Sequence, residues 1–75
     1  MSSEVTLNTK GLLCPLPVIR TQDAIRELSV GDTLNIIASD PGTLHDIPAW
    51  TRVHGHHLLS ATQEGNDYHF CIEVL

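Results

Sequence analysis

The sequence has few basic residues, few cysteines and no long apolar run. Among its 75 residues, four are Lys or Arg and nine are Asp or Glu, so the formal net charge is −5. Nucleic-acid binders use clusters of basic side chains to neutralise phosphates, so we expect no direct contact with nucleic acid. No apolar run is long enough to cross a bilayer, so we expect no membrane contact either.

The amino-terminal stretch and the cysteines indicate the compartment. "MSSEVTLNTK" lacks the basic and apolar regions of a signal peptide. Cys14 and Cys71 are the two cysteines, too few for a disulfide framework and not in a CxxC pair. We therefore expect a cytoplasmic protein with free thiols. Residues 1–75 have room for one small domain, and they show no repeat or linker.

Hydrophobic periodicity predicts six elements in the order β-α-β-α-β-β. The expected strands are 4–8, 33–39, 58–64 and 67–74, and the expected helices run from about 15 to 28 and from about 43 to 54. Strand–helix–strand units are normally parallel and right-handed, and so short a chain cannot cover both faces of a sheet. The prediction is a two-layer α/β (α+β) sandwich, with a four-stranded mixed sheet and two helices on one face.

Helix boundaries follow from local signals. Gly31 is expected to close the first helix and Gly55 the second. Thr43 and Asp46 have the spacing of a capping box. Pro48 predicts a distorted first turn, or a true start nearer Asp46.

Cys14 lies between the first strand and the first helix, in "GLLCPLPVIR". This is the carboxyl edge of parallel strands, where ligand sites tend to lie, and "DPGT" at 40–43 should reach the same edge. If Cys14 is the N-cap, Pro15 and Pro17 occupy the first turn as N1 and N3, where prolines are tolerated. The amides of Leu16 and Val18 would then face the sulfur.

A thiol at a helix N-terminus should have a lowered pKa. We expect a modest shift for Cys14 unless a cation helps, and Lys10 and Arg20 are the candidates nearby in sequence. A rigid, partly ionised thiol can attack a donor sulfur, become a persulfide and be attacked in turn. Without a second thiol at CxxC spacing the persulfide would persist, which favours a carrier over an oxidoreductase.

The run "GLLCPLPVIR", with "VGDTLNIIASDPGT" and "DIPAW" downstream, resembles the TusA (SirA-like) family of sulfur carrier proteins over essentially the whole chain. "CPLP" matches the family's CPxP motif. The resemblance implies a two-layer sandwich, a sulfurtransferase activity without cofactor or metal, and a persulfide on Cys14 supported by Pro15 and Pro17. Asp40, Pro41 and Gly42 would belong to the same rim.

The resemblance also implies partners. The sulfur donor would be a cysteine desulfurase or a rhodanese, and the acceptor a DsrE-type protein. The sulfur would end in 2-thiouridine of tRNA (tRNA thiolation) or move the opposite way in dissimilatory sulfur oxidation. We expect a monomer, because a carrier must keep its rim free.

Further residues are candidates for partner contacts or have structural explanations. Ile19, Arg20 and His45 are candidate contacts near the thiol, each also explained as an ordinary exposed helix residue. Cys71 should face the helix-free side of the sheet, and Trp50 should pack the second helix onto the sheet. The remaining histidines are not expected to form a metal site: His54, His56, His57 and His69.

Two other functions remain open from the residues alone. The protein could be a redox or peroxidatic thiol protein that forms a sulfenate on Cys14. It could also be a non-catalytic regulatory interaction module in which Cys14 only caps a helix.

Overall fold

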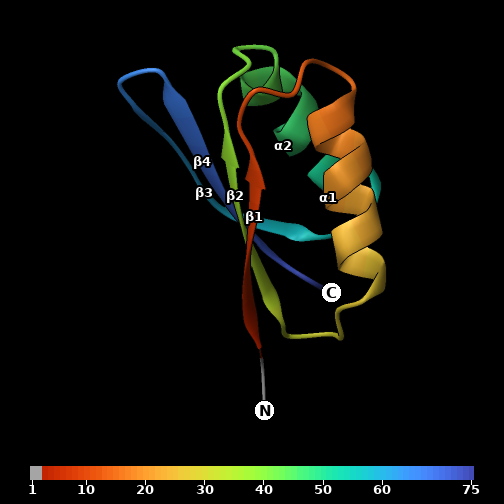
Figure 1. The fold of residues 1–75 in the computed structure, drawn as a ribbon. Coiled ribbons are helices and arrows are strands. Elements are labelled where there is room, and N and C mark those ends of the chain that lie inside the picture. Colours follow the sequence, from red (N-terminus) through yellow and green to blue (C-terminus); the bar gives the residue numbers. More distant parts are fainter. Residues whose placement is uncertain (1–2) are drawn as a thin grey trace.

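The computed structural model describes residues 3–75 and has the predicted order of elements (Figure 1). The strands and helices are β1 (Glu4–Thr9), α1 (Leu16–Arg26), β2 (Thr33–Ala38), α2 (Thr43–Val53), β3 (His57–Glu64) and β4 (Asp67–Glu73). In the described part of the chain, no helix is long and apolar enough to cross a membrane.

The four strands form one mixed sheet in the order β1-β2-β4-β3. β1 pairs with β2 in parallel, whereas β4 pairs antiparallel with both β2 and β3. Both helices cover the same face of the sheet (Figure 1). The predicted mixed two-layer sandwich is therefore confirmed, with each helix in a crossover between parallel strands.

The core lies between the helices and the central strands β2 and β4. Alternate residues of these strands are buried, as period-two patterning requires: Leu34, Ile36, Ala38, Tyr68, Phe70 and Ile72. Ile25 of α1 and Ile47 of α2 close the core from the helical side. β1 is an edge strand, so its Val5 remains 39% exposed.

The ends of α1 differ from the prediction. α1 runs from Leu16 to Arg26, not from about 15 to 28, and Glu27 is its C-cap. Gly31 is therefore not the terminating glycine. Its φ of +93° serves the turn before β2, where its amide donates to the Val74 carbonyl at 2.8 Å.

α2 begins at Thr43 although Pro48 lies inside it. Pro48 has no N–H to donate to the Leu44 carbonyl, and the helix continues through this missing bond. The suggested later start near Asp46 was wrong. Gly55 follows the C-cap His54 with a φ of +75°, so the predicted glycine stop is confirmed.

Candidate functional site

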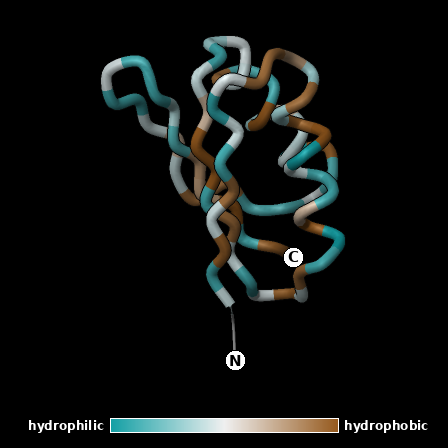
Figure 2. The backbone as a smooth tube through the Cα atoms, in the orientation of Figure 1, coloured by the Kyte–Doolittle hydropathy of each residue, from teal (hydrophilic) through white to brown (hydrophobic). Residues whose placement is uncertain are grey.

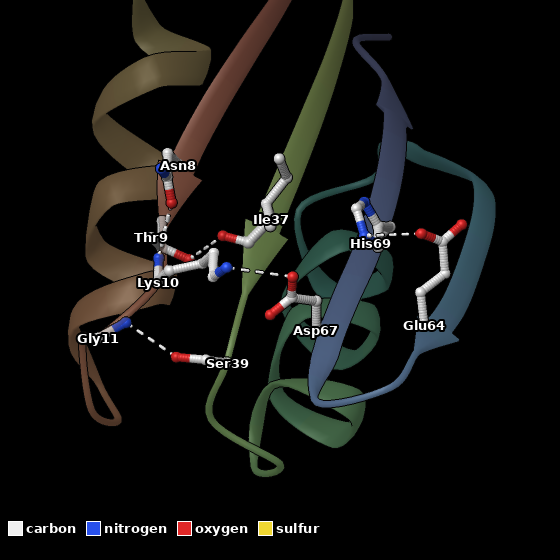
Figure 3. Close-up of polar contacts among 9 residues, drawn as sticks. All are labelled: Asn8, Thr9, Lys10, Gly11, Ile37, Ser39, Glu64, Asp67 and His69. Atoms are coloured by element: carbon white, nitrogen blue, oxygen red, sulfur yellow. Dashed lines mark hydrogen bonds and ion pairs between the residues drawn. The ribbon is translucent and has the colours of Figure 1, made fainter.

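The loops after β1 and β2 are joined at the carboxyl edge of the parallel strands. The Gly11 amide donates to the Ser39 hydroxyl oxygen at 2.8 Å, drawn in Figure 3, and the Cys14 amide donates to Asp40 Oδ2 at 2.9 Å. Thr9 is buried at the end of β1 and donates its hydroxyl to the Ile37 carbonyl at 2.8 Å (Figure 3). These bonds hold the loop that carries Cys14 against the turn after β2.

The Cys14 thiol is exposed and donates a hydrogen bond to Asp46. Its Sγ lies 2.9 Å from Asp46 Oδ2 in the first half of α2. Asp40 holds the backbone of Cys14 while Asp46 contacts its sulfur, so two carboxylates define the position of one thiol. The sequence placed Cys14 and residues 40–42 on one rim, and the structure brings Cys14 and Asp40 into contact.

The expected capping role of Cys14 is wrong. Pro15 is the N-cap of α1, so Pro17 lies at N2, and the peptide bond between Cys14 and Pro15 is cis. The Leu16 amide, expected to face the sulfur, instead donates to the Leu13 carbonyl at 2.9 Å. Pro17 is buried, so it anchors the first turn of α1, and both prolines still lie where helical amides would have no partner.

The charge around the thiol also differs from the prediction. The hydrogen bond to Asp46 raises the pKa of the Cys14 thiol above its usual value, and the negative charges of Asp46 and Asp40 act in the same direction. A carboxylate that accepts from S–H stabilises the thiol, and two nearby negative charges disfavour the thiolate. The expected lowering by the helix N-terminus was therefore wrong for the free protein.

Lys10 does not supply the cation that was considered. Its ammonium lies 3.1 Å from Asp67 Oδ2, which ties the end of β1 to the start of β4 on the helix-free side (Figure 3). Arg20 is exposed on α1 and is not among the groups that shift the pKa of the thiol.

The turn at residues 40–42 is organised by Asp40. Its Oδ1 accepts from the Gly42 amide at 3.2 Å, and its carbonyl accepts the Thr43 hydroxyl at 2.7 Å. Gly42 is the N-cap of α2 and Thr43 is already helical, so the predicted capping box does not form. The Asp46 carboxylate is free to serve the thiol instead. Pro41 is exposed in this turn.

Exposed apolar side chains gather at the same end of the molecule. Figure 2 shows a hydrophobic stretch in the loop between β1 and α1. Leu13 is 71% exposed, Leu16 43% and Leu44 43%. Ile19, the one such residue singled out from sequence, is exposed as expected at 46%. We call Leu13, Leu16, Ile19 and Leu44 the apolar rim residues.

The histidines are spread over the structure. His45 is exposed in the first turn of α2, beside Asp46 in sequence. His54 stacks on Trp50 with ring centroids 4.4 Å apart. On the helix-free side of the sheet, His57 Nδ1 lies 3.5 Å from Glu73 Oε1, and His69 Nε2 lies 3.7 Å from Glu64 Oε2. Within residues 3–75 no three His, Cys, Asp or Glu side chains are grouped to hold a metal ion.

Cys71 and Trp50 lie where the pattern placed them. Cys71 alternates with buried Phe70 and Ile72 in β4, so it faces the helix-free side, and burial raises the pKa of its thiol. Trp50 is half-buried against the core from α2.

Sequence reasoning missed Asp46 as the partner of the thiol. Asp46 was assigned to a capping box because it follows Thr43 by three residues. The contact depends on how far α2 tilts over the loop before α1, which periodicity does not specify. The one sequence feature that could have linked Asp46 to the site was its position at the start of "DIPAW" (46–50), one of the runs that resemble the family.

A two-layer α/β sandwich with one exposed cysteine between two carboxylates, at the carboxyl edge of its parallel strands, defines a small thiol protein suited to sulfur chemistry. Residues 5–74 match the family model described as Sulfurtransferase TusA. The chain belongs to this family, whose members act in sulfur transfer.

Several proteins are similar over most of their length. YrkI of Bacillus subtilis is 42% identical over 73 residues, covering 97% of each chain. The sulfur carrier protein TusA of Allochromatium vinosum is 37% identical over 67 residues, covering 89% of this chain and 88% of its own. The sulfur carrier protein TusA of Pseudomonas entomophila is 41% identical over 69 residues, covering 92% and 86%.

A solved structure confirms the fold. The SirA-like protein from Desulfitobacterium hafniense superposes with a TM-score of 0.82, covering 92% of this chain and 95% of that one, at 20% sequence identity. At this identity the likeness concerns the fold alone.

Proposed function

We propose that the protein carries sulfane sulfur as a persulfide on Cys14, accepting it from one protein and passing it to another. The observation that carries this proposal is the exposed Cys14 thiol, fixed at the rim by Asp40 and Asp46, in a chain of the TusA family. Pro15 and Pro17 support the sulfur by stiffening the start of α1.

The reaction needs no external oxidant. The sulfur of Cys14 attacks the outer sulfur of a donor persulfide, R–S–SH, and the donor's own S–S bond breaks. The donor cysteine leaves as a thiolate and takes up the proton that Cys14 released. The products are R–SH and a Cys14 persulfide. The outer sulfur has moved from the donor cysteine to Cys14 without net oxidation, and unloading to an acceptor is the same step in reverse.

The apolar rim residues support a protein as the partner in both steps. Exposed leucine and isoleucine beside a reactive group suit a docking surface for another protein. A cysteine desulfurase or a rhodanese is the proposed donor and a DsrE-type protein the acceptor, in the cytoplasm. The relay would serve tRNA thiolation or sulfur oxidation.

A transfer assay tests the proposal. Purified cysteine desulfurase and ³⁵S-cysteine are mixed with the wild type, Cys14→Ser or Cys71→Ser, and label on the carrier is counted with and without reductant. Wild type and Cys71→Ser should take up reductant-labile label, and Cys14→Ser should not. Equal labelling of Cys14→Ser would refute the assignment, provided that circular dichroism shows all three folded.

A peroxidatic function is the second candidate, because Cys14 is exposed. Titration with hydrogen peroxide distinguishes the two functions. A peroxidatic thiol would be converted stoichiometrically to sulfenate within seconds at neutral pH. The raised pKa of Cys14 in the free protein argues for a slow reaction.

A further inference from the structure

We propose that Asp46 restrains Cys14 as a neutral thiol in the free protein, and that a partner activates the thiol by placing an arginine or lysine side chain against this carboxylate. The inference rests on the proposed function, because it names the partner chemistry that the Cys14 site requires. It assigns Asp46 as a positioning residue that acts through the thiol.

The hydrogen bond between Cys14 and Asp46 has a direction. The thiol S–H donates a hydrogen bond to Asp46 Oδ2, and the distance from Sγ to Oδ2 is 2.9 Å. A thiolate has no proton to donate, so loss of the proton would leave two negatively charged atoms at this distance. The geometry therefore suits the protonated sulfur and opposes the nucleophilic form.

The charged groups around the sulfur reinforce this restraint. α2 contributes Asp46 and the loop before it contributes Asp40, whose charge acts in the same direction. The ammonium of Lys10 is held by Asp67 on the helix-free side. In the part of the chain that the structure describes, neither Asp40 nor Asp46 forms an ion pair, so both carboxylates are available to a cation from a partner.

Asp46 is poorly suited to act as the base that removes the proton. An aspartate carboxylate is a far weaker base than a thiolate, so transferring the proton to it costs more free energy at neutral pH than releasing the proton to water. The contact is therefore better explained as a restraint on the free thiol than as a general-base pair.

A guanidinium or ammonium group would reverse the effect. Paired with Asp46, it would occupy the carboxylate oxygen that accepts from the thiol and would neutralise the nearby charge. The proton of Cys14 would pass to water, and the thiolate would attack the outer sulfur of the bound donor. A partner with a basic side chain beside its own reactive sulfur fits both the carboxylates and the apolar rim residues.

Alkylation of the free protein tests the restraint without any sulfur donor. Iodoacetamide is neutral, so its rate with Cys14 as a function of pH reports the thiolate fraction, and peptide mass spectrometry reads Cys14 and Cys71 separately. Asp46→Asn should alkylate Cys14 about two- to tenfold faster than wild type at pH 7, the range for losing one hydrogen bond. Its pH profile should move to lower pH.

Two further variants complete this experiment. Asp46→Glu keeps the charge but moves the oxygens, and its rate should lie between those of wild type and Asp46→Asn. Asp23→Asn is the control: it removes an exposed carboxylate of α1 whose Oδ1 lies 3.7 Å from Arg26 Nη1. The alkylation rate of Cys14 in this variant should match that of wild type. The restraint is refuted if the Asp46→Asn profile coincides with that of wild type while circular dichroism shows both folded.

Charged peptide probes test the partner chemistry. Two tripeptides, Arg-Cys-Arg and Glu-Cys-Glu, each carry thionitrobenzoate as a mixed disulfide on the central cysteine. Cys14 attacks the disulfide and releases coloured thionitrobenzoate. In a Cys71→Ser background at low salt, the arginine peptide should react faster than the glutamate peptide, and Asp46→Asn should reduce this ratio. Equal rates, or a ratio unaffected by Asp46→Asn, would overturn activation by a partner cation.

The two proposals fail separately. Failure of ³⁵S labelling on Cys14 would refute the carrier function and leave the alkylation profile intact. A wild-type alkylation profile in Asp46→Asn would refute the restraint and leave labelling intact.

Discussion

Ile47 connects the stability of the core to the position of Asp46, because the two residues are adjacent on α2. Ile47 is 0% exposed and packs in the main core cluster. Truncating such a side chain to alanine removes buried methyl groups and leaves a cavity, at a cost of about 2–5 kcal/mol. A 75-residue domain has a total stability of about 4–11 kcal/mol, so Ile47→Ala should remove much of it.

A graded series makes this prediction quantitative. Ile47→Val should cost about 0.5–1.5 kcal/mol and lower Tm by about 4–8 °C for each kcal/mol. Leu44→Ala on the same helix is the control, because Leu44 is 43% exposed and should cost about 0.5 kcal/mol or less. Urea and thermal unfolding followed by circular dichroism measure all three. Equal losses for Ile47→Ala and Leu44→Ala would refute the assignment of Ile47 to the core.

Three further predictions concern sites away from the thiol. The amides of Ser29 and Ser3 lower the pKa of Asp32, so its stabilising contribution exists above the ordinary carboxyl pKa and is lost as pH falls through the lowered value. In the Asp32→Asn variant, the urea unfolding midpoint should therefore fall less between neutral and acid pH than it does in wild type. An equal fall in both proteins would contradict this. Gly31→Ala should cost about 1–2 kcal/mol in urea unfolding, because φ is +93° although no atom lies within 4 Å of the added Cβ; a stabilised variant would exclude that strain. Lys10→Met breaks a pair whose side chains are 48% and 34% exposed, so it should cost about 0–1 kcal/mol and less at high salt.

The fold could be predicted because its determinants are local. The alternation in 67–74 and the apolar run in 33–39 identify the two central strands, and the length of the chain limits the helices to one face. The ends of α1 were less accurate, because Gly31 is a turn glycine that resembles a helix terminator in sequence.

The site could be predicted in position but not in charge. "CPLP" after the first strand placed Cys14 at the rim, and "DPGT" placed Asp40 beside it. Asp46 on α2 meets the sulfur of Cys14 in the loop before α1, a contact between residues 32 positions apart. Local propensity carries no information about such a pair, so the sign of the pKa shift at Cys14 was predicted wrongly.

Locating the sulfur after loading tests directly whether Cys14 is the residue that carries it. The wild type is incubated with inorganic polysulfide, alkylated, digested and analysed by peptide mass spectrometry. We predict one additional, reductant-labile sulfur atom on the peptide that contains Cys14, and none on the peptide that contains Cys71. Sulfur found on the Cys71 peptide would contradict this prediction. A Cys14 peptide that remains unmodified, although free thiols in the same sample acquire sulfur, would contradict it as well.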